Sequence, residues 1–487
     1  MLRRLRSYFS PAFNWLSTLQ HRREETKKAV LFFSFLFLAC ACYHLLRNTK
    51  LAFLLPQQES GAEVLPFIKI WCVLPASMLV SPLLSHMFDH WNQRKIFYVI
   101  LSSFLLFYTF FLISLPIHKH LYLDQFSHFL SLHLPSGARG LLVTIRYWPF
   151  SLFYITSELW SSVVLSVLCW GFANQAFSVS QARKFYSILS LGPTLGGIFV
   201  GCLMEGYSLY IPEKHLMACS LLTVLILGLT LVGMFYLSSH YLTHTKSLAI
   251  SKSKKKNVPF HKHWSILRSS PYILLITLMV FFYGSLNHIT ETVWHFQLVK
   301  TYPKEHDYFQ YLGYITRTTS IGATVFALFS FFLIRSASWT WVAMITPMVF
   351  GVMSFGMFGS MFFHMGYDPI FFGSLQVCFL KASKFTLFDP TKEIALMNLP
   401  SAMIMKGKTA ADVLGSRSGK SAGALILQMA ILLSGSLEEA IFYLFFFVSA
   451  GSFLWIFTTI LLGKMISRKK GAEISVSDPS IPIATAK

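Results

Sequence analysis

The chain consists largely of long apolar runs separated by polar breaks, and this repetition limits what it can fold into. An α-helix needs roughly 17–25 residues to cross a bilayer whose hydrocarbon core is about 30 Å thick. Twelve apolar segments are candidates for such helices. They lie near residues 29–46, 64–88, 96–116, 141–173, 182–204, 216–238, 271–296, 310–334, 339–360, 367–388, 410–435 and 440–464. The pattern therefore predicts an all-α membrane protein with about twelve transmembrane helices.

The composition supports this interpretation and excludes the soluble classes. Hydrophobic residues make up 54% of the 487 residues and charged residues only 13%, about half the charged share of an average soluble domain. The seven cysteines form no C-x-x-C pair, so neither a disulfide framework nor a metal site is expected. The sequence also shows no metal-spaced set of His and Glu and no nucleophile with a paired base. We therefore expect no cofactor and no enzymatic activity.

One polar connection is much longer than the others and divides the chain into two similar parts. It covers residues 239–270 and contains the basic run 252–256. Six predicted helices lie on each side of it, which is the major-facilitator-like organisation of two parallel six-helix halves. The predicted domains are a basic N-terminus (1–28), a first half (29–238), the linker (239–270), a second half (271–465) and a polar tail (466–487).

A weak internal repeat supports this division. Residues 191–197, in the fifth segment, read L-G-P-T-L-G-G, and residues 414–420, in the eleventh, read L-G-S-R-S-G-K. Glycines at matched positions favour close packing between helices. The second copy carries Arg417 and Lys420 in place of uncharged residues, an asymmetry that suits a substrate with one charged end.

The basic residues indicate which side of the membrane each loop faces. The N-terminus, the even-numbered loops and the C-terminus together hold 27 of the 41 Lys and Arg residues, whereas the odd-numbered loops hold seven. Cytoplasmic loops of membrane proteins carry such an excess of Lys and Arg. We therefore expect both termini and the linker to be cytoplasmic. Because the basic residues follow these loops, we expect no binding of nucleic acid.

The remaining seven basic residues lie within or beside the apolar segments. They are Lys69, Arg146, Arg317, Lys381, Lys384, Arg417 and Lys420, and their acidic counterparts are chiefly Glu158, Glu291, Asp389 and Asp412. A charge at the centre of a bilayer costs on the order of 2.5–3.5 kcal/mol, so each needs a partner or a watery cavity. Structural ion pairs would account for individual residues. The basic excess of the whole set instead indicates a cavity for an anion such as a polyphosphate.

Several runs carry a specific family pattern. The longest begins at Glu158-Leu159-Trp160, ends at Asn174-Gln175 and is followed by residues 182–186. Further matching runs are residues 60–69, 383–393 and 406–421. Together they are spread from residue 47 to residue 423, which is nearly the whole membrane domain. With these runs the chain resembles the ATP/ADP translocases of plastids and obligate intracellular bacteria.

The resemblance implies exchange of ATP for ADP by alternating access, in the inner membrane of a bacterium. The substrates would be ATP, ADP or other nucleotides, and the transporter would work as a monomer in the lipid bilayer. The family residues that are important for transport fall on Lys50, Glu158, Glu291 and Lys420. A family amide falls on Asn174, where we expect a contact to the base or the ribose.

The expected site combines these residues with two further cations of the second half. The residues expected to face the phosphates are Lys50, Lys384, Arg417 and Lys420. Glu158 and Glu291 are expected to hold these cations in the empty state or to bind a proton. Asn174 and nearby aromatic rings are expected to hold the base.

Three positions depart from the family pattern, namely Leu51, Pro193 and His295. They leave the nucleotide range and the coupling mode open. The alternative within transport is proton-coupled net import of nucleotides. The alternative from another class is a scaffold or enzyme that retains the fold without transporting.

Overall fold

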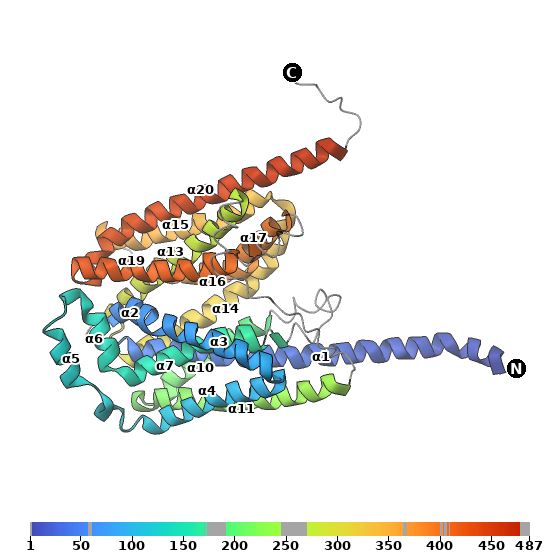
Figure 1. Ribbon diagram of the computed structural model, residues 1–487, viewed down its shortest axis with the longest axis horizontal. Helices are drawn as coiled ribbons and strands as arrows, with labels where there is room; N and C mark the ends of the chain where they lie inside the picture. Colours follow the sequence, from blue (N-terminus) through green and yellow to red (C-terminus); the bar gives the residue numbers. More distant parts are fainter. Residues whose placement is uncertain are drawn as a thin grey trace, which may run out of the picture. The chain divides into compact units, whose positions relative to one another are not determined.

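The computed structural model consists of helices joined by short connections in the residues that it describes (Figure 1). These are residues 2–56, 61–169, 171–172, 191–244, 270–363, 368–399, 403, 407–408 and 410–477. No strand occurs among these residues, so the prediction of an all-α protein is confirmed. The basic run 252–256 and the candidate base contact Asn174 lie outside the described residues.

The α-helices are long in the membrane segments and short in the connections. The sequence up to the linker forms α1 (Leu2–Leu54), α2 (Val64–Ile68), α3 (Leu74–His90), α4 (Gln93–Ser114), α5 (Asp124–Ser131), α6 (Arg139–Arg146), α7 (Trp148–Leu159), α10 (Leu191–Tyr210) and α11 (Glu213–His244). The sequence after it forms α13 (Pro271–Thr301), α14 (Glu305–Ser336), α15 (Trp339–Phe363), α16 (Pro369–Ser383), α17 (Asp389–Met397), α19 (Ser418–Ser434) and α20 (Leu437–Ser477).

Shorter helical segments of other types join these α-helices. The π-helical segments are η2 (Lys69–Val73), η5 (Trp160–Cys169), η6 (Lys384–Phe388) and η7 (Ala410–Arg417). The 3₁₀ segments are η1 (Gly61–Glu63), η3 (His118–Leu121) and η4 (Ser136–Ala138).

Among the described residues, eight helical stretches are long and apolar enough to cross a membrane. They are Glu25–Leu54, Gly61–His90, Arg94–Ser114, Trp148–Cys169, Glu213–Ser239, Pro271–Thr301, Trp339–Phe362 and Leu437–Arg468. The pair Pro369–Ser383 and Thr386–Met397, bent by 40°, would make a ninth. The other three predicted segments coincide with α10, α14 and α19. The protein is thus a multi-pass membrane protein, and the count of twelve spans stays a prediction.

Local sequence signals determine where several of these helices begin and end. Ser270 caps α13, because its side chain accepts a hydrogen bond from the backbone N–H of Ile273, and Pro271 follows it. Asp368 caps α16 in the same way and is also followed by proline. Proline suits the first turn of a helix because its missing N–H would have no intrahelical partner there. At the end of α19, Gly435 adopts a φ of 88°, a left-handed conformation that stops the helix.

The helices form two compact units. The first unit comprises residues 1–51, 77–119 and 153–252, and in its core Phe97 stacks on Phe235 with the ring centroids 3.6 Å apart. The second unit comprises residues 52–76, 120–152 and 253–487, and its helix α13 packs against α16, α19 and α20. The predicted division into two halves between residues 238 and 271 stays a prediction.

The glycines of the internal repeat allow close helix packing inside each unit. A Cβ atom added at Gly419 of α19 would lie 2.5 Å from the backbone oxygen of Phe281 in α13. A Cβ atom added at Gly196 of α10 would lie 3.1 Å from the backbone oxygen of Phe37 in α1. Helix α19 thus packs on α13 through the same repeat positions by which α10 packs on α1.

Candidate functional site

In the first unit the structure brings together two predicted site residues, Lys50 and Glu158. Nζ of Lys50 lies 2.6 Å from Oε1 of Glu158 and 4.4 Å from the centroid of the Tyr154 ring. Lys50 lies near the C-terminal end of α1 and Glu158 near the end of α7, so the pair joins these two helices. The side chain of Lys50 is only 3% exposed, whereas that of Glu158 is 31% exposed. The cation is therefore buried, and its carboxylate partner is the more accessible of the two.

In the second unit Glu291 makes a similar contact with Lys381. Oε1 of Glu291, on α13, lies 3.3 Å from Nζ of Lys381, on α16, and both side chains are partly buried. The sequence places Lys381 among the membrane cations but does not show that it pairs with Glu291. The only sequence signal for it is its position one turn before Lys384 on the same helix. Each unit therefore holds one glutamate of the predicted site beside a lysine.

The other three predicted cations lie at or next to π-helical segments of the second unit. Lys384 is the first residue of η6, Arg417 is the last residue of η7, and Lys420 lies in the first turn of α19. Lys384 experiences repulsion from the like charge of Lys420 and attraction from the opposite charge of Asp389. Arg417 and Lys420 are exposed and Lys384 is partly buried. A polyanion would relieve the repulsion within this group.

Two of the membrane-segment acids instead surround a lysine of the predicted cytoplasmic loop. Oδ1 of Asp412 lies 2.8 Å from Nζ of Lys392, and Oδ1 of Asp389 lies 3.9 Å from it. Glu393 lies beside the same lysine and also pairs with Lys408 at 3.0 Å. This network ties α17 to η7, so its structural role accounts for these acids.

Helix α13 also carries two histidines that the sequence did not assign to the site. Nδ1 of His288 lies 3.1 Å from Nζ of Lys69. His295 is one of the three positions that differ from the family pattern. Its Nδ1 lies 2.7 Å from the hydroxyl of Tyr308, and both side chains are buried. His288 and His295 are one turn before and one turn after Glu291, so the three side chains follow one side of the helix. This spacing around Glu291 is the signal by which His288 could have been found.

The other two departures from the family pattern fit the helices that contain them. Leu51 is buried next to Lys50 in α1. Pro193 is the third residue of the described part of α10, which continues to Tyr210. Neither residue therefore interrupts the elements that carry the candidate site.

Each π-helical segment that the structure describes overlaps one of the runs that carry the family resemblance, although η2 shares only Lys69 with its run. Segment η2 begins at Lys69, η5 begins two residues after Glu158, η6 begins at Lys384, and η7 ends at Arg417. A π-helical turn inserts a residue into an α-helix, and such insertions are frequent at functional sites. The family motifs are thus also the places where the membrane helices depart from regular geometry.

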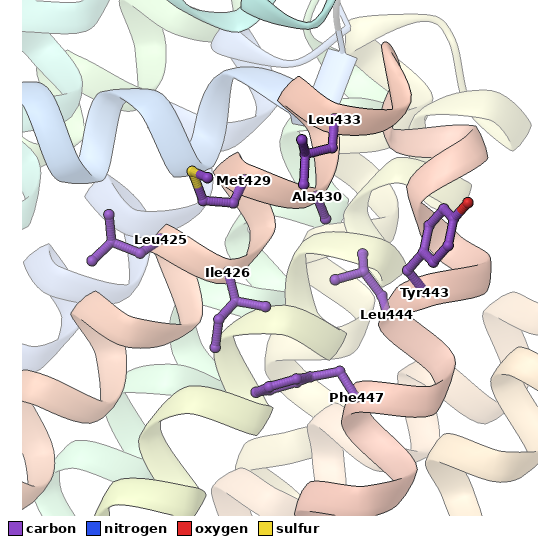
Figure 2. Close-up of a pocket in the computed structure, with 8 residues that line it drawn as sticks. All are labelled: Leu425, Ile426, Met429, Ala430, Leu433, Tyr443, Leu444 and Phe447. Atoms are coloured by element: carbon purple, nitrogen blue, oxygen red, sulfur yellow. The ribbon is translucent and has the colours of Figure 1, made fainter.

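A groove of about 620 Å³ between α19 and α20 has a different character (Figure 2). Its lining consists of Leu425, Ile426, Met429, Ala430, Leu433, Tyr443, Leu444 and Phe447. No charged side chain is among these residues, so the groove cannot neutralise a phosphate. Its lining suits lipid acyl chains, and the candidate site residues are not part of it.

Solved structures with a similar fold are membrane transporters. A bacterial homologue of the iron transporter ferroportin, in its inward-facing state, matches with a TM-score of 0.58, 14% identity and coverage of 91% of this chain and 98% of that one. The nucleoside transporter NupG matches with a TM-score of 0.54, 14% identity and coverage of 90% and 98%. At this identity the likeness shows the fold alone, and it confirms the predicted major-facilitator-like fold.

Sequence relatives match most of the length of the chain. ADP,ATP carrier protein 1 of Chlamydia trachomatis serovar D is 30% identical over 478 residues, which are 92% of this chain and 90% of the relative. The chloroplastic ADP,ATP carrier protein 1 of Arabidopsis thaliana is 30% identical over 85% of this chain and 69% of its own length. ADP,ATP carrier protein 4 of Rickettsia prowazekii is 29% identical over 95% of each. The family model of the TLC ATP/ADP transporters matches residues 14–466, and the chain therefore belongs to this family.

Proposed function

We propose that this protein exchanges ATP for ADP across the membrane by alternating access. Its relatives from Chlamydia, Rickettsia and Arabidopsis bear the name ADP,ATP carrier protein. The structural observation that supports the proposal is the pair of Lys–Glu contacts, Lys50–Glu158 and Lys381–Glu291, one in each unit. Each places a lysine at a position where a phosphate could replace the carboxylate.

The chemistry of these contacts suits exchange. Phosphate oxygens accept charge-assisted hydrogen bonds from lysine as carboxylate oxygens do, so the cation keeps a partner when a nucleotide displaces the glutamate. When the nucleotide leaves, the glutamate pairs with the lysine again, so neither of these two lysines is left without a counter-charge in the empty state. In this proposal Lys384, Arg417 and Lys420 hold the rest of the phosphate chain, and Asn174 contributes to the base or ribose contact.

The proposal includes an orientation and a location. Both termini would face the cytoplasm of a bacterial cell, because 27 of the 41 basic residues fall on that side of the predicted topology. The protein would work as a monomer, because in this fold class the substrate path lies between the two halves of one chain. It would have no cofactor and no catalytic step.

Uptake of labelled ATP into cells that express the protein tests the proposal. For exchange, we expect preloading of the cells with ADP to accelerate uptake and a protonophore to leave it unchanged. Uptake that collapses with a protonophore and ignores internal ADP would instead identify proton-coupled net import. A protein that is present in the membrane and takes up no nucleotide at all would contradict both.

A further inference from the structure

A ladder of tyrosines along α14 ends at an arginine inside a predicted membrane segment. The rings of Tyr302 and Tyr311 stack with their centroids 5.0 Å apart and an angle of 26° between their planes. The centroids of Tyr311 and Tyr314 are 6.1 Å apart, and the guanidinium carbon of Arg317 lies 5.9 Å from the Tyr314 centroid. Tyr302 is the C-cap of α13, and the other three residues follow at three-residue steps on α14. Aromatic faces thus lead directly to a cation.

The ladder is held in place on one side and accessible on the other. The hydroxyl of Tyr311 lies 2.7 Å from Oγ of Ser374, which also accepts a hydrogen bond of 3.1 Å from Nε1 of Trp294. These contacts to α13 and α16 fix the orientation of the Tyr311 ring. Tyr314, the next ring, is 47% exposed. A flat ligand could therefore reach Tyr314 without displacing the buried part of the ladder.

Counted along the helices, Arg317 falls at a depth similar to that of the Lys381–Glu291 pair. It is twelve residues from the start of α14, and Lys381 is twelve residues from the start of α16, about 18 Å along each helix. Glu291 is ten residues from the end of α13, about 15 Å. These three helix ends share one side of the predicted topology, and α14 packs on α16. This count places the arginine and the ion pair in one charged layer of the predicted membrane segments.

This depth argues against a position in contact with lipid. A charge in the hydrocarbon region is expensive, and such residues face a protein interior or a watery cavity. Because Tyr314 lies beside the Arg317 guanidinium, it shares that environment. Counted along α14, Tyr314 lies about 4.5 Å nearer than Arg317 to the outer end of the helix, and Tyr311 lies about 9 Å nearer. The aromatic rings and the charged layer are thus one to two helical turns apart along α14.

We propose that the nucleobase stacks on Tyr314, with Tyr311 behind it, while Arg317 and Lys381 hold the phosphates one turn deeper. This inference rests on the proposed nucleotide transport and names the part of the site that recognises the base. Phosphate-facing cations alone bind any polyphosphate, whereas an aromatic face also binds the flat ring of a base. The guanidinium of Arg317 lies over the Tyr314 ring, 5.9 Å from its centroid, so it is near enough to contact a stacked base as well.

The replacement Tyr314→Leu removes the aromatic face and keeps a bulky side chain. In proteoliposomes that contain the full chain, we expect it to raise the KM for ATP about tenfold. Inhibition of ATP uptake by inorganic tripolyphosphate, which has no base, should stay unchanged. Tyr314→Trp keeps an aromatic face and should retain a KM close to that of the unaltered protein. Arg317→Gln should weaken the binding of both ATP and tripolyphosphate.

Tyr443→Leu is a matched control, because Tyr443 is also an exposed tyrosine of a membrane helix but lines the apolar groove of Figure 2. Its KM for ATP should not change. An unchanged KM for ATP in Tyr314→Leu would overturn the inference. An equal loss of apparent affinity for ATP and for tripolyphosphate would also overturn it. If Tyr314→Leu does not reach the membrane, Tyr314→Met makes the same test. Absence of ATP uptake by the unaltered protein would instead overturn the proposed function, so the two failures are distinguishable.

Discussion

Two lysine–glutamate contacts with similar geometry have very different surroundings. Lys50–Glu158 and Lys300–Glu438 both have an N–O distance of 2.6 Å, but the lysine side chain is 3% exposed in the first and 44% exposed in the second. Exposed ion pairs contribute roughly 0–1 kcal/mol to stability. Removing one partner of a buried pair costs much more, because it leaves a charge without compensation in a poorly solvated place. At the scale of single residues, burial therefore makes Lys50 the critical cation of the first unit.

We predict that Lys50→Ala lowers ATP uptake at least about tenfold, a loss of about 1.4 kcal/mol, and also lowers the unfolding temperature in detergent. Lys300→Ala is the matched control, and both quantities should change little. The exchanged pair Lys50→Glu with Glu158→Lys should recover much of the unfolding temperature but not the uptake, because the cation then starts from α7 and no longer from α1. Full recovery of uptake in the exchanged pair would show that the contact is only structural.

At the scale of elements, glycines determine how closely α19 approaches α13. A Cβ atom added at Gly423 would lie 2.6 Å from the backbone oxygen of Ser285, one turn along from the contact between Gly419 and Phe281. A backbone atom cannot move aside as the end of a flexible side chain can. In contrast, a Cβ atom added at Gly322 of α14 would meet nothing within 4 Å in the part of the chain that is described. Gly419 and Gly423 thus allow the helix that carries Lys420 to pack closely on the helix that carries Glu291.

This difference predicts opposite effects of the same substitution. Alanine favours a helix over glycine by up to about 1 kcal/mol, so Gly322→Ala should be neutral or slightly stabilising. At Gly423 the clash with α13 should outweigh that gain, since overpacking costs typically about 1–3 kcal/mol. Thermal unfolding of the two purified variants in detergent measures the difference. A Gly423→Ala protein as stable as Gly322→Ala would mean that α13 and α19 separate easily.

At the scale of the whole molecule, segments from the predicted first half pack within the second unit. Residues 52–76 and 120–152 belong to that unit together with 253–487. One of the contacts is a hydrogen bond of 2.7 Å in which Oε1 of Glu63 accepts from the backbone N–H of Leu437, at the start of α20. The predicted topology assigns both residues to the outer side of the membrane. In the predicted topology this contact joins the two six-helix halves, so an alternating-access cycle that separates the halves on the outer side would break it.

We therefore predict that Glu63→Ala shifts the population toward the outward-open state. A protein binds a ligand more tightly when the competent state is more populated, so the KM for external nucleotide should fall and the KM for internal nucleotide should rise. Uptake measured in right-side-out and inside-out vesicles separates the two values. Glu63→Gln keeps an oxygen acceptor for the backbone N–H of Leu437, so its KM values should be close to those of the unaltered protein. Glu439→Ala, at an exposed position, is a second control with the same expected result. A change of both KM values in the same direction would argue against this contact as part of a gate.

The sequence by itself determined the helical membrane fold, the predicted orientation and the family. These depend on the length of each apolar run against the thickness of a bilayer, on counts of Lys and Arg in loops, and on short motifs, all of which are local. Most of the candidate cations and both glutamates could be found in this way, because a charge in an apolar run is conspicuous in any context.

Only the tertiary structure decided which of these charges meet. Glu291 pairs with Lys381, Lys69 lies beside His288, and Asp412 pairs with Lys392. Each contact depends on which helices pack together and on their rotation about their axes, and periodicity within one helix does not specify either. The three-residue spacing of Tyr311, Tyr314 and Arg317 on α14 already predicts that they are neighbours. The stacking of Tyr302 on Tyr311, in contrast, depends on how the end of α13 lies against α14.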